Sequence, residues 1–246
     1  MMITSSQNEK IKNLRVLFKE KKAREEQNVF LAEGVNLVKD IPATYFVRDL
    51  FVKASKYDEL SSLEDKFNLE AWVVDDRIFD ALGDTVAPSG VIAVVEKPPV
   101  VTKVEGDTVF LLDGITDPGN LGTIIRTAAA KGIGYVVCMD CTDAYSPKCV
   151  RAAMSGTFFV RIAECNEEEA LRLVEGYDIA ALDMGGTDIY DYRRGKKLAL
   201  TVGSEAHGVR KSVRNKAKDI LAIPMNGKIE SLNAAISIGI AAYVIR

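Results

Sequence analysis

The chain has 246 residues, 48% of them hydrophobic, which is enough to bury one large core or two modest ones. No apolar run reaches the roughly 18–20 residues of a membrane helix, and the first residues lack the apolar segment of a secretory signal peptide. We therefore expect a cytoplasmic protein with no membrane partner. A net charge of −3 is unusual for a nucleic-acid-binding protein, so any RNA contact must come from local basic clusters.

Residues 1–97 are predicted to form a small α/β domain, because helical and strand patterns alternate along them. The first helix is predicted at 8–26, where Ile11, Leu14, Leu17 and Phe18 share one stripe. Strands are then predicted at 29–32, 46–53, 71–74 and 91–95, separated by helical stretches at 35–40, 58–67 and 77–82. Pro98 and Pro99 open a predicted linker that covers residues 98–106.

Residues 107–246 are predicted to form a second α/β domain. Its strands are predicted at 108–112, 135–139, 158–162, 179–182, 198–202 and 220–223. Helices are predicted at 121–131, 147–154, 166–175 and 210–217, and an almost uncharged helix runs to the C-terminus. This alternation predicts a mainly parallel sheet with helices on both faces.

Three loops in this second domain combine glycine with polar side chains. Their sequences are Asp-Pro-Gly-Asn at 117–120, Gly-Ser-Glu-Ala-His-Gly at 203–208 and Glu-Ser-Leu-Asn at 230–233. The third loop enters the uncharged helix, where polar groups without partners would cost stability. Open α/β sheets bind ligands at the carboxyl ends of their strands. The sequence therefore predicts that the three loops form one site.

In this order, these stretches resemble the three motifs of the SpoU (TrmH) family, which belongs to the SPOUT superfamily. Members transfer a methyl group from S-adenosyl-L-methionine (AdoMet) to RNA ribose 2'-hydroxyls, leaving S-adenosyl-L-homocysteine (AdoHcy) and using no metal. The resemblance implies a trefoil knot in residues 107–246 and a homodimer with the active site near its interface. Residues 1–97 resemble the ribosomal-protein-like RNA-binding domain that precedes the catalytic domain in many members. The implied substrate is RNA, with ribosomal RNA favoured over tRNA.

The resemblance also implies roles for individual residues. The implied catalytic residues are Asn120, Arg126, Glu205, Ser231 and Asn233. The implied cofactor-binding residues, which act mainly through the backbone, are Leu182, Gly185, Gly203, Gly208, Ile223, Met225 and Leu232. His207 is left outside the catalytic set.

Arg126 needs a chemical interpretation, because a ribose hydroxyl must lose its proton before it attacks. A guanidinium effectively never gives up its own proton in a protein. We therefore interpret Arg126 as a bidentate phosphate ligand that also stabilises the developing alkoxide. A structural salt bridge is the alternative.

The predicted RNA contacts lie on two helices. The set consists of Lys10, Lys12, Arg15, Lys21, Lys22, Arg24, Lys148 and Arg151. Lys148 and Arg151 are one helical turn apart, a spacing that suits a phosphate. Solvated helix faces and surface ion pairs are the alternative interpretations.

Two further questions stay open in the sequence. Cys138 and Cys141 form a Cys-x-x-Cys pair, but Cys138 ends an apolar run, so a buried hydrophobic role is favoured over zinc.

The alternative functions are a tRNA ribose methyltransferase and a non-catalytic RNA-binding or ribosome-assembly protein on the same scaffold. A small-molecule ribose methyltransferase is a third alternative, which the basic first helix disfavours.

Overall fold

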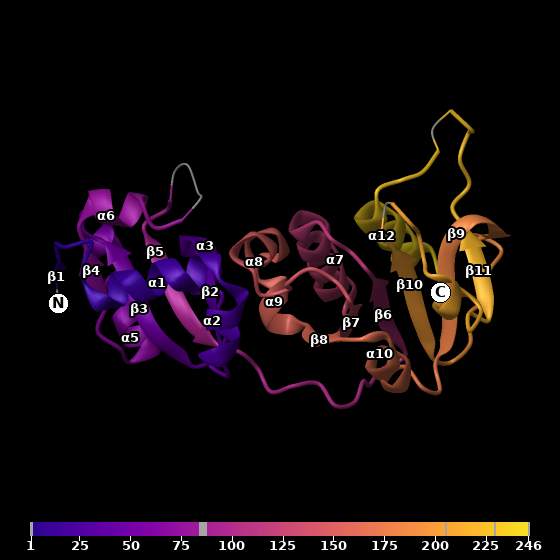
Figure 1. Cartoon of the computed structure of the whole chain (residues 1–246), viewed down its shortest axis with the longest axis horizontal. Helices are drawn as coiled ribbons and strands as arrows, with labels where there is room; N and C mark the ends of the chain where they lie inside the picture. The colour runs from indigo at the N-terminus through magenta and orange to yellow at the C-terminus, as the bar shows by residue number, and fades with distance from the viewer. Residues whose placement is uncertain (1, 84–87, 205, 229, 246) are drawn as a thin grey trace. The chain divides into compact units, whose positions relative to one another are not determined.

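The computed structural model describes residues 2–83, 88–204, 206–228 and 230–245. It contains two compact units, the first comprising Met1–Pro99 and Tyr145–Arg151 and the second Val100–Ala144 and Ala152–Arg246 (Figure 1). Tyr145–Arg151 belongs with the first unit, which was not expected from the sequence. Nothing in its local pattern distinguishes it from the surrounding chain.

The first unit contains a mixed sheet of five strands in the order β1-β4-β3-β5-β2. The strands are β1 (Met2–Ile3), β2 (Val29–Glu33), β3 (Val47–Lys53), β4 (Trp72–Val74) and β5 (Val91–Glu96). The helices are α1 (Glu9–Lys19), α2 (Lys21–Glu26), α3 (Val35–Lys39), the 3-10 helix η1 (Ala54–Lys56), α4 (Tyr57–Leu60), α5 (Ser62–Phe67) and α6 (Asp76–Asp80). The predicted helix at 8–26 is in fact two, because Glu20 takes an extended backbone (φ −110°, ψ 115°) between α1 and α2. The predicted stripe is confirmed in α1, where Ile11, Leu14 and Leu17 are buried.

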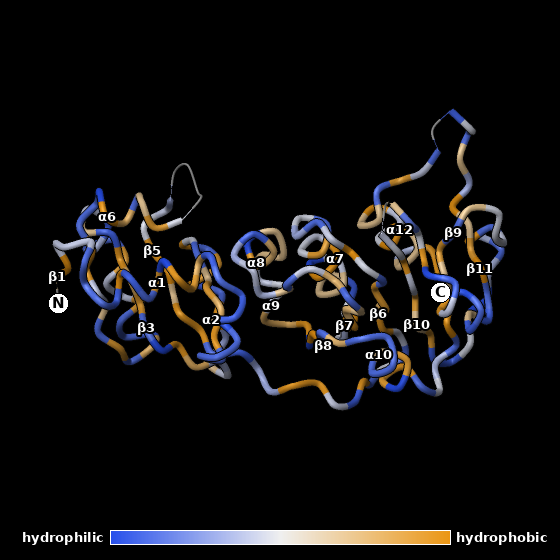
Figure 2. Tube along the Cα trace, viewed as in Figure 1, coloured by the Kyte–Doolittle hydropathy of each residue, from blue (hydrophilic) through white to orange (hydrophobic). Residues whose placement is uncertain are grey.

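The second unit contains a sheet of six strands in the order β11-β9-β10-β6-β7-β8. The strands are β6 (Thr108–Asp113), β7 (Tyr135–Met139), β8 (Arg161–Cys165), β9 (Asp178–Asp188), β10 (Leu198–Gly203) and β11 (Asp219–Ala222). Every pairing in this sheet is parallel, so the predicted parallel sheet is confirmed. Parallel strands are covered on both faces and therefore read as continuous apolar runs. Figure 2 shows hydrophobic residues concentrated in the strands.

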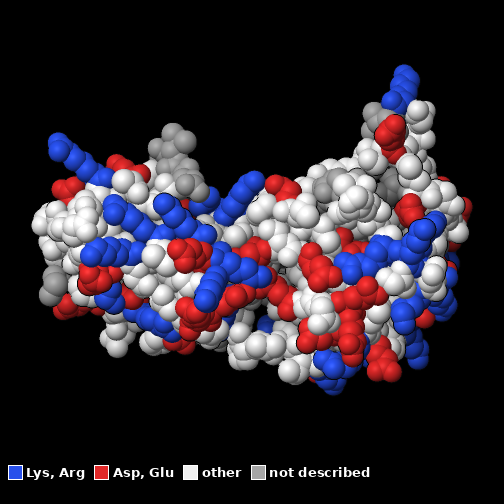
Figure 3. Space-filling model, in the orientation of Figure 1, with Lys and Arg blue, Asp and Glu red and all other residues white. Residues whose placement is uncertain are grey.

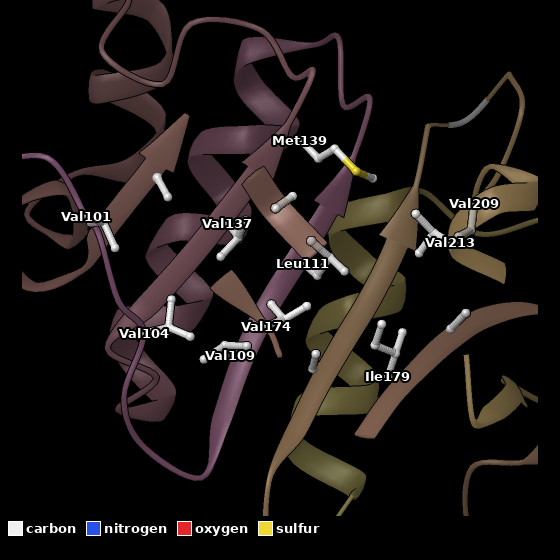
Figure 4. Close-up of a cluster of buried hydrophobic side chains, with 14 residues drawn as sticks. Val101, Val104, Val109, Leu111, Val137, Met139, Val174, Ile179, Val209 and Val213 are labelled. Carbon is white, nitrogen blue, oxygen red and sulfur yellow. The ribbon is translucent and has the colours of Figure 1, made fainter. Parts of the chain in front are cut away.

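Helices cover both faces of this sheet, as predicted. The helices of the second unit are α7 (Pro118–Lys131), α9 (Gly156–Phe159), α10 (Glu167–Leu173), α11 (Lys211–Arg214) and α12 (Ala234–Val244). The helix α8 (Pro147–Ala153) begins in the first unit and ends in the second. On one face, alternate strand residues such as Val109, Leu111 and Val137 pack with α10 and α11 (Figure 4). On the other face, α7 and α12 pack against each other and against the sheet.

One predicted strand begins in the wrong place. Residues 158–162 were expected to be extended, but Phe158 lies in α9 and β8 begins at Arg161. A short apolar run fits a helical turn as well as a strand, so periodicity alone does not separate them. Tertiary packing decides here, because Gly156 lies so close to α7 that a Cβ on it would sit 3.0 Å from the Arg126 Cα.

Two sequence-based expectations concern larger features. Among the described residues, none of the helices combines the length and the apolar character that a membrane crossing requires. The trefoil knot stays a prediction that rests on the family resemblance.

The buried centre of the parallel sheet predicts a large loss of stability on truncation. Phe110 in β6 is fully buried, so Phe110→Ala is expected to lower the free energy of unfolding by about 3–5 kcal/mol. Phe159→Ala is the matched control, since that ring is 62% exposed and its loss should change the free energy by less than about 0.5 kcal/mol. Chemical denaturation followed by circular dichroism measures both. Equal losses would contradict the assignment of Phe110 to the core.

Candidate active site

A cavity of about 370 Å³ lies in the second unit where β10 and β11 end. Four parts of the chain contribute lining residues: 182–184 in β9, 202–204 with 207–208 at and after the end of β10, 221–223 with 225 at and after the end of β11, and 230–232 with 234 and 237 before and within α12. The volume falls within the range of about 300–1,000 Å³ that is usual for small-molecule sites. The position at the carboxyl ends of parallel strands agrees with the site predicted from the second and third loops.

The second loop forms the part of the wall that is closest to the sheet. Gly203 ends β10, and the chain then folds back so that the Gly208 N–H donates to the Ser204 carbonyl at 2.8 Å. A Cβ added to Gly203 would lie 1.9 Å from the Gly208 carbonyl oxygen, and Gly208 itself has φ +62°. The backbone therefore requires glycine at both positions, and both residues line the cavity.

The first and third loops are joined by a hydrogen bond between two asparagine side chains. Asn233 caps α12, because its Oδ1 accepts from the N–H groups of Ala235 (2.9 Å) and Ile236 (3.3 Å). Its Nδ2 donates to Oδ1 of Asn120 at 2.9 Å. Asn120 lies in the first turn of α7, where its own N–H donates to the capping residue Asp117. Two helix N-termini therefore meet through one amide pair.

Arg126 lies further along α7 and is exposed. Among the residues that the structure describes, it forms no ion pair, so the structural salt bridge considered above is not observed. Its backbone packs against Gly156 of α9. The guanidinium is therefore held on a rigid helix and is open to an external anion.

Two carboxylates, Asp183 and Glu230, line the cavity. Arg214 of α11 pairs with Asp183 at 3.0 Å, which anchors that part of the wall. Among the other described residues that line the cavity there is no Asp, Glu, Lys or Arg. With Asp183 paired to Arg214, Glu230 supplies negative charge to the wall, which favours a ligand that carries positive charge.

Comparison with known families adds an independent observation. Residues 107–243, more than half of the chain, match the SpoU rRNA Methylase family, and residues 8–93 match an MRM3-like substrate binding domain. The chain belongs to the SpoU rRNA methylase family.

Relatives of known sequence and structure agree with this membership. The 23S rRNA (guanosine(2553)-2'-O)-methyltransferase RlmP of Bacillus subtilis is 32% identical over 252 residues, which cover 99% of this chain and 98% of that protein. The AdoMet-bound rRNA methyltransferase of Sinorhizobium meliloti superposes with a TM-score of 0.87 at 28% identity, covering 99% of this chain and 96% of that one. The SpoU methyltransferase AviRb of Streptomyces viridochromogenes, solved in complex with AdoMet, gives 0.85 at 27% identity, with 97% of each chain covered.

The structure brings most of the implied SpoU motif residues to this one place. Ser231 and the residues implied for the cofactor line the cavity, except that Gly185 lies in an adjoining hollow that shares Met184, Ile223 and Met225 with it. Asn233 and Asn120 are joined beside it. Glu205 lies outside the described residues.

Sequence reasoning missed several residues that line the cavity. They are Ser204, His207, Glu230 and Ser237. His207, Ser204 and Glu230 were visible within the SpoU motifs but were given no role in the site. Ser237 had no signal of its own, since it reaches the cavity only because it lies one helical turn after Asn233.

The implied RNA-contacting residues of α1 and α2 are largely balanced by nearby acids. Figure 3 shows lysine and arginine side chains on this face of the first unit, with acidic side chains between them. The pairs are Lys10–Asp49 (2.7 Å), Lys12–Glu9 (3.1 Å), Lys21–Glu25 (3.5 Å) and Lys22–Glu26 (3.7 Å). Arg15 donates to the Ser6 carbonyl. The pairs of Lys12, Lys21 and Lys22 are exposed and contribute about 0–1 kcal/mol each, so a phosphate can replace the acid there at little cost.

Two implied RNA contacts need correction. Arg24 is only 3% exposed, and its Nη1 donates to the Leu17 carbonyl at 2.6 Å, so it holds α2 to α1 and is not available to RNA. Arg151 pairs with the buried carboxylate of Glu33 at 2.7 Å within the first unit, which is the ion-pair alternative. Lys148 on the same helix is exposed.

The cysteines have no metal partners in the described part of the chain. None of the four forms a disulfide, and no group of three or more His, Cys, Asp or Glu side chains is placed there to hold a metal ion. Cys138 is buried, as its place at the end of an apolar run predicts. Burial, followed by the charge of Glu169, raises the pKa of Cys165 to about 11, so this thiol stays protonated at neutral pH.

The contact between Gly203 and Gly208 predicts that a single methyl group disrupts the cavity. Gly203→Ala places a Cβ 1.9 Å from the Gly208 carbonyl oxygen, so the loop must move. The free energy of unfolding should therefore fall by about 1–3 kcal/mol. Gly134→Ala is the matched control, because nothing lies within 4 Å of its Cβ position. Thermal unfolding of the two variants beside the native chain tests this. Similar melting temperatures for both would contradict the observed close approach.

Proposed function

We propose that this protein transfers a methyl group from AdoMet to a ribose 2'-hydroxyl of ribosomal RNA. The observation that carries the proposal is the junction of the SpoU motifs: the Gly203 loop and the Ile223–Leu232 segment enclose one cavity, and Asn120 and Asn233 are bonded beside it. The relatives RlmP and RlmB are both 23S rRNA 2'-O-methyltransferases, which supports the choice of substrate.

The cavity fits AdoMet in size, polarity and charge. Leu182, Ile223 and Leu232 offer apolar surface for an adenine face, and the main chain at Gly203 and Gly208 offers hydrogen-bonding groups for its edge. Glu230, which lies on the wall beside the Asp183–Arg214 ion pair, gives the cavity a negative charge that suits a cationic cofactor. When bound, AdoMet supplies a methyl group on a sulfonium whose leaving group is neutral, so the transfer needs no metal. The product is AdoHcy.

We assign several side chains of this protein to act on the RNA ribose. The paired amides of Asn120 and Asn233, together with the Ser231 hydroxyl, orient the sugar beside the cavity. Arg126 binds an adjacent phosphate with both arms of its guanidinium and stabilises the negative charge that develops on the 2'-oxygen. Since guanidinium keeps its proton, the proton leaves to phosphate or water. Glu205 is assigned to orient Arg126 or the RNA.

The first unit is proposed to hold the RNA. Residues 1–97 contain the match to an MRM3-like substrate binding domain, and the exposed lysines of α1 and α2 present its positive charge. We assign RNA contact to Lys10, Lys12, Arg15, Lys21, Lys22 and Lys148. The linker at 98–106 and the catalytic domain at 107–246 complete this organisation.

A homodimer in the cytoplasm completes the proposal. One side of α12 exposes large apolar side chains at helical spacing, with Ile236 51% and Tyr243 54% exposed. Exposed apolar stripes on a helix are typical of subunit interfaces. This stripe begins three residues after Asn233, which agrees with an active site near the interface.

The role of Arg126 predicts a sharp difference between its variants. Arg126→Ala should lower methyl transfer by about 100-fold or more, and Arg126→Lys should recover only part of that loss, because one ammonium cannot replace a bidentate fork. Arg172→Ala is the matched control, an exposed arginine on α10 of the same unit. The assay follows tritium from methyl-labelled AdoMet into ribosomal RNA and tRNA. Label must appear in alkali-resistant dinucleotides, since ribose methylation blocks alkaline cleavage.

Each outcome of that assay separates the alternatives. Label on ribosomal RNA alone is expected. Label on tRNA alone would show that tRNA, and not ribosomal RNA, is the substrate. AdoMet binding without label on either RNA would indicate an assembled ribosomal subunit as substrate. No AdoMet binding would contradict the proposed enzyme, and full activity of Arg126→Lys would contradict the bidentate role.

The lysines of the first unit predict a change in salt dependence. Lys12→Gln combined with Lys22→Gln should weaken RNA binding and reduce the slope of log affinity against log salt by about 2, because each phosphate contact contributes about one unit. Lys39→Gln combined with Lys66→Gln is the control on other helices of the same unit. Fluorescence anisotropy with a ribosomal RNA fragment over a salt series measures both. An unchanged slope in the first variant would remove α1 and α2 from the RNA surface.

A further inference from the structure

Asp113 is a buried carboxylate beside the cavity loop that the proposed mechanism does not use. It ends β6 and is the in-register neighbour of Gly203 on β10. Only 3% of the residue is exposed. A carboxylate at this depth requires charged or hydrogen-bonding partners to remain ionised.

Arg210 supplies those partners from both its backbone and its side chain. Its N–H donates to Asp113 Oδ2 and its Nε to Oδ1, each at 2.7 Å. Its Nη1 reaches Asp140 after β7 (2.9 Å) and Glu167 at the start of α10 (3.1 Å). Burial alone would lower the pKa of this guanidinium, but the hydrogen bonds to the three acids raise the pKa above its ordinary value. Arg210 therefore stays charged and joins three structural elements.

The place of Arg210 in the chain connects this cluster to the cavity. It follows Val209, which is buried in the core beside Val213 (Figure 4), and it comes two residues after Gly208, which lines the cavity. The loop thus leaves the sheet at Gly203, the last residue of β10. It comes back to the sheet where Arg210 bonds to Asp113, the residue of β6 that is paired with Gly203. Val209 packs the returning chain into the core cluster that includes Val109 and Leu111 of β6, and Arg210 adds hydrogen bonds to Asp113 at the end of the same strand.

We propose that Arg210 is a positioning residue for the cofactor: together with Asp113 it holds the Gly203–Gly208 loop in the shape that forms the cavity wall. A guanidinium suits this role because its donors have a rigid, planar arrangement, which fixes direction as well as distance. The identity of the ligand as AdoMet or AdoHcy rests on the proposed function, whereas the role of Arg210 in holding the loop is independent of it.

The test uses the full chain and three variants. Arg210→Met removes the guanidinium and leaves Asp113 with only the backbone N–H of residue 210. Asp113→Asn combined with Arg210→Met removes both charges, so the melting temperature should recover toward the native value. Lys218→Met is the control, because it breaks an ion pair with Asp178 (2.9 Å) that lies outside the cavity lining. The readouts are melting temperature, AdoHcy affinity by calorimetry, and hydrogen exchange of Ser204, His207 and Gly208 in the ligand-free protein.

If Arg210 positions the loop, the melting temperature and the AdoHcy affinity should respond differently to the two variants that lack it. Both variants without Arg210 should exchange these amides faster and bind AdoHcy about tenfold more weakly, as expected when about one molecule in ten holds the competent loop. The double variant should regain its melting temperature without regaining affinity, and Lys218→Met should match the native chain in exchange and affinity. Recovery of affinity together with melting temperature would overturn the inference, because Arg210 would then only neutralise Asp113.

Failure of the proposed function gives a different result. If the native chain binds no AdoHcy, the assigned cofactor is wrong, while the exchange rates still decide whether Arg210 holds the loop. Unchanged exchange in both variants would overturn the inference whatever the ligand.

Discussion

The in-register parallel pairing of β10 with β6 is the constraint on which the site depends. It places Gly203 beside Asp113, so one edge of the sheet carries both a backbone that a ligand can approach closely and a buried carboxylate. The apolar residues of these strands hold the register, because both faces of the sheet are covered by helices. A shift of one residue would turn every strand side chain to the opposite face. The arrangement of the cavity therefore follows from the core beneath it.

The polar groups at this edge stabilise the fold and also prepare the site. Asn233 caps α12 and at the same time bonds to Asn120, so an amide that satisfies a helix N-terminus also joins two motifs of the SpoU family. Asp117 caps the start of α7 by accepting a hydrogen bond from the N–H of Asn120. Because these groups are satisfied by one another, the loops keep their arrangement without a ligand, which reduces the ordering cost of binding.

Charge is used differently in the two units. In the second unit, Arg210 and Arg214 are committed to carboxylates that fix the walls of the cavity, and Arg126 stays exposed. In the first unit, exposed lysines form weak pairs along their own helices. A protein with net charge −3 can in this way present local positive surface, since weak exposed pairs exchange readily for phosphate.

The sequence by itself determined the α/β class, the parallel sheet, most strand positions and the loops that form the cavity. These are local properties, carried by the period of apolar residues and by glycine next to polar side chains at strand ends. Only the tertiary structure decided which charges are used inside the fold. Arg24 and Arg151 looked like RNA ligands, yet they bind the Leu17 carbonyl and Glu33. The bonds of Asn233 to Asn120 and of Arg210 to Asp113 span 113 and 97 positions in the chain. No local pattern encodes partners at that separation, because they meet only when the strands between them are packed into the sheet.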